Sequence, residues 1–186
     1  MITFKGSLEE KKLIDFPMNR QMFSYTCGSS VVQSILSYYG INKREDEIVK
    51  ILDSNKKEGT HIEAIKKYLT KNNITFEEKT NCDSNDLIGF LDDGHPTVML
   101  VQAWTDKKNV KWKNEWNSGH YVVAIGYDDN DFIFEDPSTH LRSSIKTTQL
   151  DDRWHDVDVN GTKYFGWCLV LKKKSNFNID KVEKMK

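Results

Sequence analysis

One stretch of this 186-residue chain, QMFSYTCGSSVVQSILSYYG from Gln21 to Gly40, limits its possible folds more than any other. Its apolar residues recur at helical spacing, so one face of a helix is expected to pack into a core; they are Val31, Val32, Ile35, Leu36 and Tyr39. Thr26 is a suitable N-cap and Gly40 a suitable end. The pattern therefore predicts a buried helix with Cys27 at or near its N-terminus.

A cysteine at the start of a helix has distinctive chemistry. Unpaired backbone N–H groups and the positive end of the helix dipole favour the thiolate, and the pKa of such thiols falls to roughly 3.5–7.5 when a charged histidine also helps. An ordinary core cysteine is the alternative interpretation of Cys27. Gln21 lies six positions upstream, where its side-chain amide and the Cys27 backbone N–H can together hold the oxygen of a tetrahedral adduct.

A histidine and an aspartate lie at matching ends of two predicted strands. The apolar segment 119–127 opens on His120, and the segment 132–136 ends on Asp136. Joined as an antiparallel hairpin, the two strands bring Asp136 beside His120. The aspartate can then accept a hydrogen bond from one ring nitrogen while the other ring nitrogen faces Cys27.

Five short motifs follow one another along residues 17–140: Gln21, Thr-Cys-Gly at 26–28, Tyr-Tyr-Gly at 38–40, Gly-His-Tyr-Val-Val at 119–123 and Asp-Pro-Ser at 136–138. In order and spacing they resemble the papain-like cysteine peptidases of the C39 and C39-like group. The resemblance implies that Gln21 lies in the oxyanion hole and that Cys27 is the nucleophile. It also implies that His120 is the general base and then the acid, and that Asp136 orients the histidine.

The resemblance leaves the acyl acceptor open. Many members that cleave leader peptides carry an aspartate before the cysteine, where this chain has Thr26, and are fused to a membrane transporter, which we do not expect here. Short relatives also resemble the amide-forming papain-like transacylases of thiotemplated peptide assembly, such as the enzyme of closthioamide biosynthesis. We therefore favour an amide-forming acyltransferase. A hydrolytic C39-like peptidase and a non-catalytic peptide-binding module are the alternatives.

The expected reaction needs no metal and no cofactor. His120 removes the thiol proton, Cys27 attacks an acyl carbon, and Gln21 helps to stabilise the oxyanion, so an acyl-enzyme thioester results. The expected partners are an acyl donor, either a thioester or a peptide, and an amine acceptor. A carrier protein is a further candidate partner.

The expected fold is α+β and papain-like, a helical half carrying the nucleophile packed on a twisted antiparallel sheet, in a single domain over residues 1–186. The sheet is expected from about residues 96–171, with a polar lead-in at 1–16 and a polar tail at 172–186. Further helices are predicted at 44–53, from a Thr60–Glu63 capping box to Lys71, and at 85–91. Further strands are predicted at 2–4, 74–79, 96–104 and 164–171.

The loop at residues 105–118 lies directly before His120 and carries two tryptophans. It is either a lid over the acyl pocket or a solvated loop whose tryptophans fold back on the core. The candidate substrate-binding residues are Trp104, Trp112, Trp116, His61 and Tyr25. His155 and Asp156 form a rival pair for the base, but adjacent residues of a strand point to opposite faces, so this pair is a weaker candidate.

Composition excludes several classes of function. A net charge of −1, from 27 basic and 28 acidic residues, gives no basic face for nucleic acid. Three cysteines without a C-x-x-C pair argue against a disulfide framework or a zinc site and fit a reducing compartment. No stretch approaches eighteen apolar residues and the N-terminus lacks a signal-peptide pattern, so we expect no membrane span and a cytoplasmic location.

Overall fold

A computed structural model describes residues 12–173, 175–182 and 184–185. Its elements are β1 (Lys12–Leu13), α1 (Cys27–Tyr38), α2 (Glu45–Leu52), α3 (Ile62–Lys71), β2 (Phe76–Lys79), α4 (Ser84–Asp92), β3 (Thr97–Gln102), β4 (Gly119–Tyr127), β5 (Asp131–Glu135), β6 (Ser143–Lys146), α5 (Leu150–Arg153), β7 (His155–Val157), β8 (Lys163–Phe165) and β9 (Cys168–Leu171), with short 3₁₀ helices at Trp112–Asn114 and Thr147–Gln149. None of these helices is long and apolar enough to cross a membrane.

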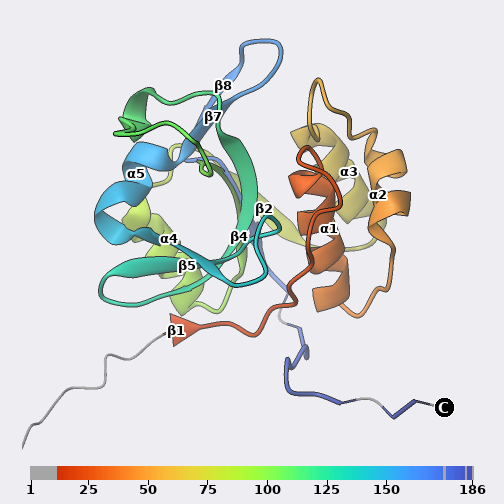
Figure 1. Cartoon of the computed structure of the whole chain (residues 1–186). Helices are drawn as coiled ribbons and strands as arrows, with labels where there is room; N and C mark the ends of the chain where they lie inside the picture. Colours follow the sequence, from red (N-terminus) through yellow and green to blue (C-terminus); the bar gives the residue numbers. More distant parts are fainter. Residues whose placement is uncertain (1–11, 174, 183, 186) are drawn as a thin grey trace, which may run out of the picture.

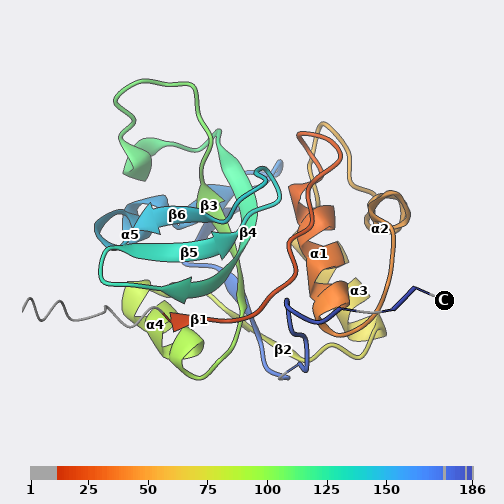
Figure 2. The ribbon, with the colours of Figure 1, turned by 60° about the horizontal axis from the view of Figure 1, so that its bottom comes forward.

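The helices lie on the two faces of one antiparallel sheet (Figures 1 and 2). The sheet has the strand order β2-β9-β3-β4-β5-β6, and β1 also pairs with β4. One hydrophobic cluster joins α1, α2 and α3 to the first face of the sheet, and a second joins α4 and α5 to the other. This arrangement confirms the predicted α+β, papain-like class, with β2 as an additional edge strand.

The predicted helix that begins at Cys27 is confirmed as α1. Its apolar face is shielded from solvent, because Val32, Ile35 and Leu36 are completely buried against the sheet. The capping detail differs from the prediction. Thr26 occupies the N-cap position without capping through its side chain, since its hydroxyl donates instead to the Glu45 carboxylate at 2.7 Å. That bond ties the segment before Cys27 to the start of α2.

The predicted hairpin that carries His120 and Asp136 is confirmed as β4 and β5, and the segment 96–104 forms β3 in the middle of the sheet. Asp136 follows directly after the last residue of β5, while His120 is the second residue of β4. The two strands run antiparallel, so the end of one lies beside the beginning of the other.

Two further local predictions differ from the structure. The capping box at Thr60 and Glu63 is wrong, because the Thr60 hydroxyl bonds to that of Ser54 at 2.8 Å and α3 begins behind His61. The final strand is split into β8 and β9 by Gly166, whose φ of 51° no extended strand permits. The strand expected at residues 2–4 lies outside the described residues.

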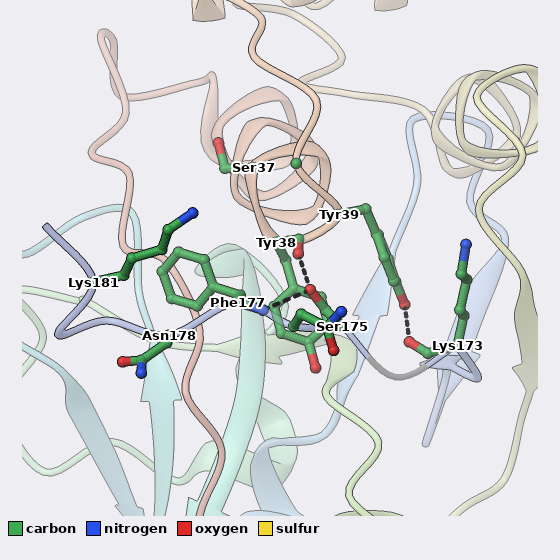
Figure 3. Close-up of a pocket in the computed structure, with 10 residues that line it drawn as sticks. Ser37, Tyr38, Tyr39, Lys173, Ser175, Phe177, Asn178 and Lys181 are labelled. Atoms are coloured by element: carbon green, nitrogen blue, oxygen red, sulfur yellow. Dashed lines mark hydrogen bonds between the residues drawn. The ribbon is translucent and has the colours of Figure 1, made fainter. Parts of the chain in front are cut away.

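The ends of the domain are less polar than expected. Phe16, within the predicted lead-in, is completely buried in the core. In the predicted polar tail, Phe177 packs on Tyr38 with ring centroids 6.2 Å apart, and the Tyr39 hydroxyl donates to the Lys173 carbonyl at 2.8 Å (Figure 3). A cavity of about 510 Å³ lies here, at the opposite end of α1 from Cys27.

Gly28 provides a test of the packing of α1. A Cβ atom on Gly28 would lie 2.6 Å from Cβ of Thr60, so Gly28→Ala should lower the free energy of unfolding by about 1–3 kcal/mol through overpacking. Gly89 of α4 is the matched control: nothing lies within 4 Å of its added Cβ, and alanine there should raise the free energy of unfolding by about 0.5–1 kcal/mol. Urea unfolding measures both. Equal stability of Gly28→Ala and the wild type would contradict the packing argument.

Candidate active site

Cys27 is the first residue of α1 and lies where the helical half meets β4. Its sulfur accepts hydrogen bonds from the His120 ring and from the backbone N–H groups of Gly28 and Tyr121. One of these backbone donors belongs to the helix and the other to the sheet. Cys27 is therefore held by both halves of the fold.

His120 and Asp136 form a buried pair. His120 Nε2 lies 2.7 Å from Asp136 Oδ1, and the two residues are only 6% and 2% exposed. With Nε2 committed to the carboxylate, Nδ1 is the ring nitrogen left for Cys27. Two further donors fix the carboxylate: the Trp104 indole N–H reaches Oδ2 at 2.9 Å, and the Ser138 backbone N–H reaches Oδ1 at 2.8 Å.

The three groups shift one another's pKa values towards an ion pair. Burial on its own would raise the pKa of the Cys27 thiol, but the hydrogen bond to His120 and its positive charge outweigh burial and lower that pKa. Burial would likewise depress the pKa of His120, yet the bonds to Asp136 and Cys27 raise it to about 9. Both shifts move the equilibrium towards a thiolate beside an imidazolium.

The other two cysteines lack this activation. Burial raises the pKa of the Cys82 thiol, and it raises the pKa of the Cys168 thiol further. Cys27 is therefore the cysteine whose surroundings favour a nucleophile.

Gln21 is fixed beside the site by the loop that follows β5. Its backbone N–H donates to the Pro137 carbonyl at 2.9 Å, and its side-chain Oε1 accepts from the Ser138 hydroxyl at 3.0 Å. The side-chain nitrogen donates one N–H to the Phe23 carbonyl at 2.8 Å. Because an amide nitrogen carries two N–H groups, the second can serve an oxyanion. The role of Gln21 as an oxyanion donor stays a prediction.

Ser138 is a site residue to which the sequence analysis assigned no role. Its backbone holds Asp136 and its hydroxyl holds Gln21, and the hydroxyl oxygen also lies 3.4 Å from His120 Nε2. The signal was present in the Asp-Pro-Ser motif, because a serine two positions after an aspartate can donate its N–H back to that carboxylate.

A cavity of about 480 Å³ opens beside Cys27, between the start of α3 and the β7–β8 hairpin. Of the five candidate substrate-binding residues, Trp116 and His61 line it. The Lys163 ammonium lies 4.6 Å from the centre of the Trp116 ring, so this ring already contacts one cation.

The structure places the other three candidates outside the cavity lining. Trp104 covers Asp136, the Trp112 ring stacks 3.7 Å from the Arg153 guanidinium, and Tyr25 stacks on Phe23 with ring centroids 5.5 Å apart. The loop 105–118 therefore contributes one tryptophan to the cleft and folds another back on α5.

The two members of the rival pair point in different directions, as adjacent residues of a strand should. His155 bonds through Nε2 to the Glu115 carbonyl at 2.7 Å and packs under Trp116 with ring centroids 4.3 Å apart. Asp156 lines the cavity beside Cys27.

The chain also matches a known protein family. The model of the Peptidase_C39 like family matches residues 13–158, which is well over half of the chain and includes Gln21, Cys27, His120 and Asp136. The chain belongs to the Peptidase_C39 like family. A comparison with curated proteins found no match.

Solved structures of C39 peptidase domains share the fold. The peptidase domain of Streptococcus ComA, a bi-functional ABC transporter involved in quorum sensing, has a TM-score of 0.61 and 18% identity over 86% of this chain and 100% of that one. A putative C39-like peptidase from Bacillus anthracis has a TM-score of 0.61 and 16% identity over 90% and 100%. A double glycine motif protease from an AMS/PCAT transporter, solved with the leader peptide, has a TM-score of 0.59 and 15% identity over 88% and 97%.

The ion pair predicts a characteristic pH profile. Alkylation of Cys27 by iodoacetamide should persist below the ordinary thiol pKa of 9.0, because the thiolate is retained until pH falls through its lowered pKa. Acyl transfer should also decline above pH about 9, where His120 loses the proton it must give to the leaving group, while alkylation stays fast. Rates measured from pH 5 to 10 test this. Alkylation that rises only near pH 9, or an adduct on Cys82 instead, would contradict the pair.

Asp136 should matter far more than His155. Asp136→Asn leaves the shape but removes the charge that fixes the ring tautomer, a change that costs up to ~10⁴-fold in rate in comparable triads. His155→Ala removes a ring that does not reach Cys27 and should change the rate per folded molecule by less than about tenfold. Single-turnover acylation, normalised to the folded fraction, measures both. A dead His155 variant beside an active Asp136 variant would require a different triad.

Proposed function

We propose that this chain is a papain-like thiol enzyme that takes an acyl group onto Cys27 as a thioester and passes it to an amine, forming an amide. The observation that carries the proposal is the Cys27 thiol at the edge of a cavity of about 480 Å³, with its pKa lowered by His120, whose ring is held by Asp136 at 2.7 Å. The cavity has space for an acceptor beside the sulfur.

The first half-reaction follows from the groups at hand. The Cys27 thiolate attacks the acyl carbon, while the Cys27 backbone N–H and the Gln21 amide donate to the oxyanion. The tetrahedral adduct collapses, the bond to the leaving group breaks, and the leaving group takes the proton from His120. The thioester then stands beside a neutral imidazole whose Nε2 is still held by Asp136.

The second half-reaction depends on the acceptor. The neutral imidazole removes a proton from the attacking amine, a C–N bond forms, and the C–S bond breaks to restore the thiolate. Water competes at ~55 M, and an amine prevails only when the site holds it, since effective molarities of well-oriented groups reach about 10⁵–10⁸ M. The carboxylate and aromatic groups on the cavity wall, Asp156 and Trp116 among them, support an amine over water.

Hydrolysis by a C39-like peptidase is the second candidate function. Its support is the likeness to solved peptidase domains, which shares the fold at 15–18% identity. A binding module without catalysis is less well supported, because it would have no use for an activated thiolate. The acyl donor, the amine and a carrier protein as the source of the acyl group belong to the proposal.

The fate of the acyl-enzyme separates the two functions. Cys27 is acylated with an activated thioester, and the loss of the adduct is followed by mass spectrometry with and without amines and amino-acid amides. We expect amide to form and the adduct to decay at least tenfold faster with a good amine, because the cavity holds it near the thioester. Cys27→Ala is the control and should carry no adduct. Equal release to water in every case, without amide, would establish the peptidase function instead.

A further inference from the structure

Asp156 is a carboxylate in the cleft that the acyl-transfer steps leave unused. It lies in the middle of β7 and lines the same cavity as Cys27. A side chain on Gly119, the residue before His120, would clash with both oxygens of the Asp156 carboxylate. The carboxylate therefore packs directly on the backbone that leads into the catalytic histidine.

Gln102 of β3 holds this carboxylate in place. Its side-chain nitrogen donates to Asp156 Oδ1 at 3.1 Å and to the His155 carbonyl at 3.0 Å, and its side-chain oxygen accepts from the Ser118 backbone N–H at 3.0 Å. Gln102 is completely buried and pairs across the sheet with Gly119. The position of Asp156 is thus fixed by the central sheet and not by the surface hairpin alone.

The charged groups near the start of α3 have partners of their own. Lys57 and His61 contact the Glu58 carboxylate at 3.4 and 2.9 Å. Glu63 pairs with Lys66 at 2.8 Å. These groups largely neutralise one another on that side of the cavity.

The Asp158 carboxylate, on the other side of the cavity, is engaged in hydrogen bonds within its own turn. It accepts from the backbone N–H groups of Asn160 and Thr162 at 2.9 and 2.8 Å, and the Tyr164 hydroxyl lies 3.3 Å away. Asp156 differs, because no lysine or arginine of the described chain forms an ion pair with it and the side chain that donates to it is the uncharged amide of Gln102. Burial raises the pKa of Asp156, and a cation brought into the cavity would stabilise its charged form.

We propose that Asp156 binds a positive charge on the acceptor amine, so that the enzyme selects acceptors with a cationic group besides the attacking nitrogen. This inference rests on the proposed function. The ammonium or guanidinium of the acceptor lies against Asp156, which shares the cavity wall with Trp116. The second nitrogen, in its neutral form, attacks the thioester and gives its proton to His120.

The chemistry of the site requires two different groups on the acceptor, one that binds Asp156 and one that attacks the thioester. An ammonium cannot attack, so the group that Asp156 holds is not the nucleophile. A charge-assisted hydrogen bond to a partly buried carboxylate anchors one end of the acceptor and raises the local concentration of the other. Asp156 is accordingly a specificity-determining residue, and the first half-reaction does not use it.

Lysinamide and norleucinamide form a matched pair for the test, because they differ by one terminal ammonium group at similar length. The acyl-enzyme is prepared as above, and amide formation from each amine is measured at pH 8 against release to water. We expect the wild type to prefer lysinamide by about ten- to a hundredfold. Asp156→Asn should reduce this preference at least tenfold, mainly by slowing the reaction of lysinamide.

Asp152→Asn is the charge control, because it removes one exposed carboxylate from α5, outside the cavity lining. It should keep the full preference. Equal reaction of the two amines with the wild-type acyl-enzyme would overturn the proposal even if Asp156→Asn fails to fold, and a preference that survives in Asp156→Asn would also overturn it. Amide from both amines without preference leaves the transferase function standing, whereas release to water alone, without amide, removes that function and this proposal together.

Discussion

The packing of the start of α1 against Thr60, which is in turn bonded to β4, is the contact on which the site depends. Gly28 leaves no room for a side chain against Thr60, and the Thr60 carbonyl accepts the Tyr121 hydroxyl at 3.0 Å. The backbone N–H of Tyr121 then reaches the Cys27 sulfur. A larger residue at position 28 would clash with Thr60 and displace the start of α1, which carries Cys27. The position of Cys27 therefore depends first on packing at the N-terminal end of α1.

The charges on Cys27 and His120 determine the reactivity of the site, and the loop after β5 stabilises these charges through Asp136. Burial of His120 and partial burial of Cys27 both oppose charge, and the pair is shifted towards its charged form because Asp136 lies behind the ring and is itself fixed by Trp104 and Ser138. The same loop holds Gln21 through Pro137 and Ser138. The orientations of His120 and Gln21 are thus coupled through three consecutive residues, Asp136, Pro137 and Ser138.

The sequence predicted those parts of the fold that local pattern determines. Helical periodicity located α1, and apolar runs located β3 and the β4–β5 hairpin that brings His120 and Asp136 together. It failed where a tertiary partner competes with a local one. The Thr60 hydroxyl bonds to Ser54 instead of capping α3, and the burial of Phe177 depends on Tyr38, which is distant in sequence.

Local sequence pattern also does not predict the direction in which loop side chains point. Trp104 adopts a φ of 55°, which turns its indole onto Asp136, and no spacing rule predicts that. A triad treats water and amines alike, so the choice between them must come from groups that line the cleft without joining the reaction. Here the β7–β8 hairpin, which lies outside the main sheet, contributes Asp156 to the cavity wall. A wall built on a separate pair of strands can change its charge without disturbing the Cys27 helix, which allows one fold to retain its nucleophile while its acceptor differs.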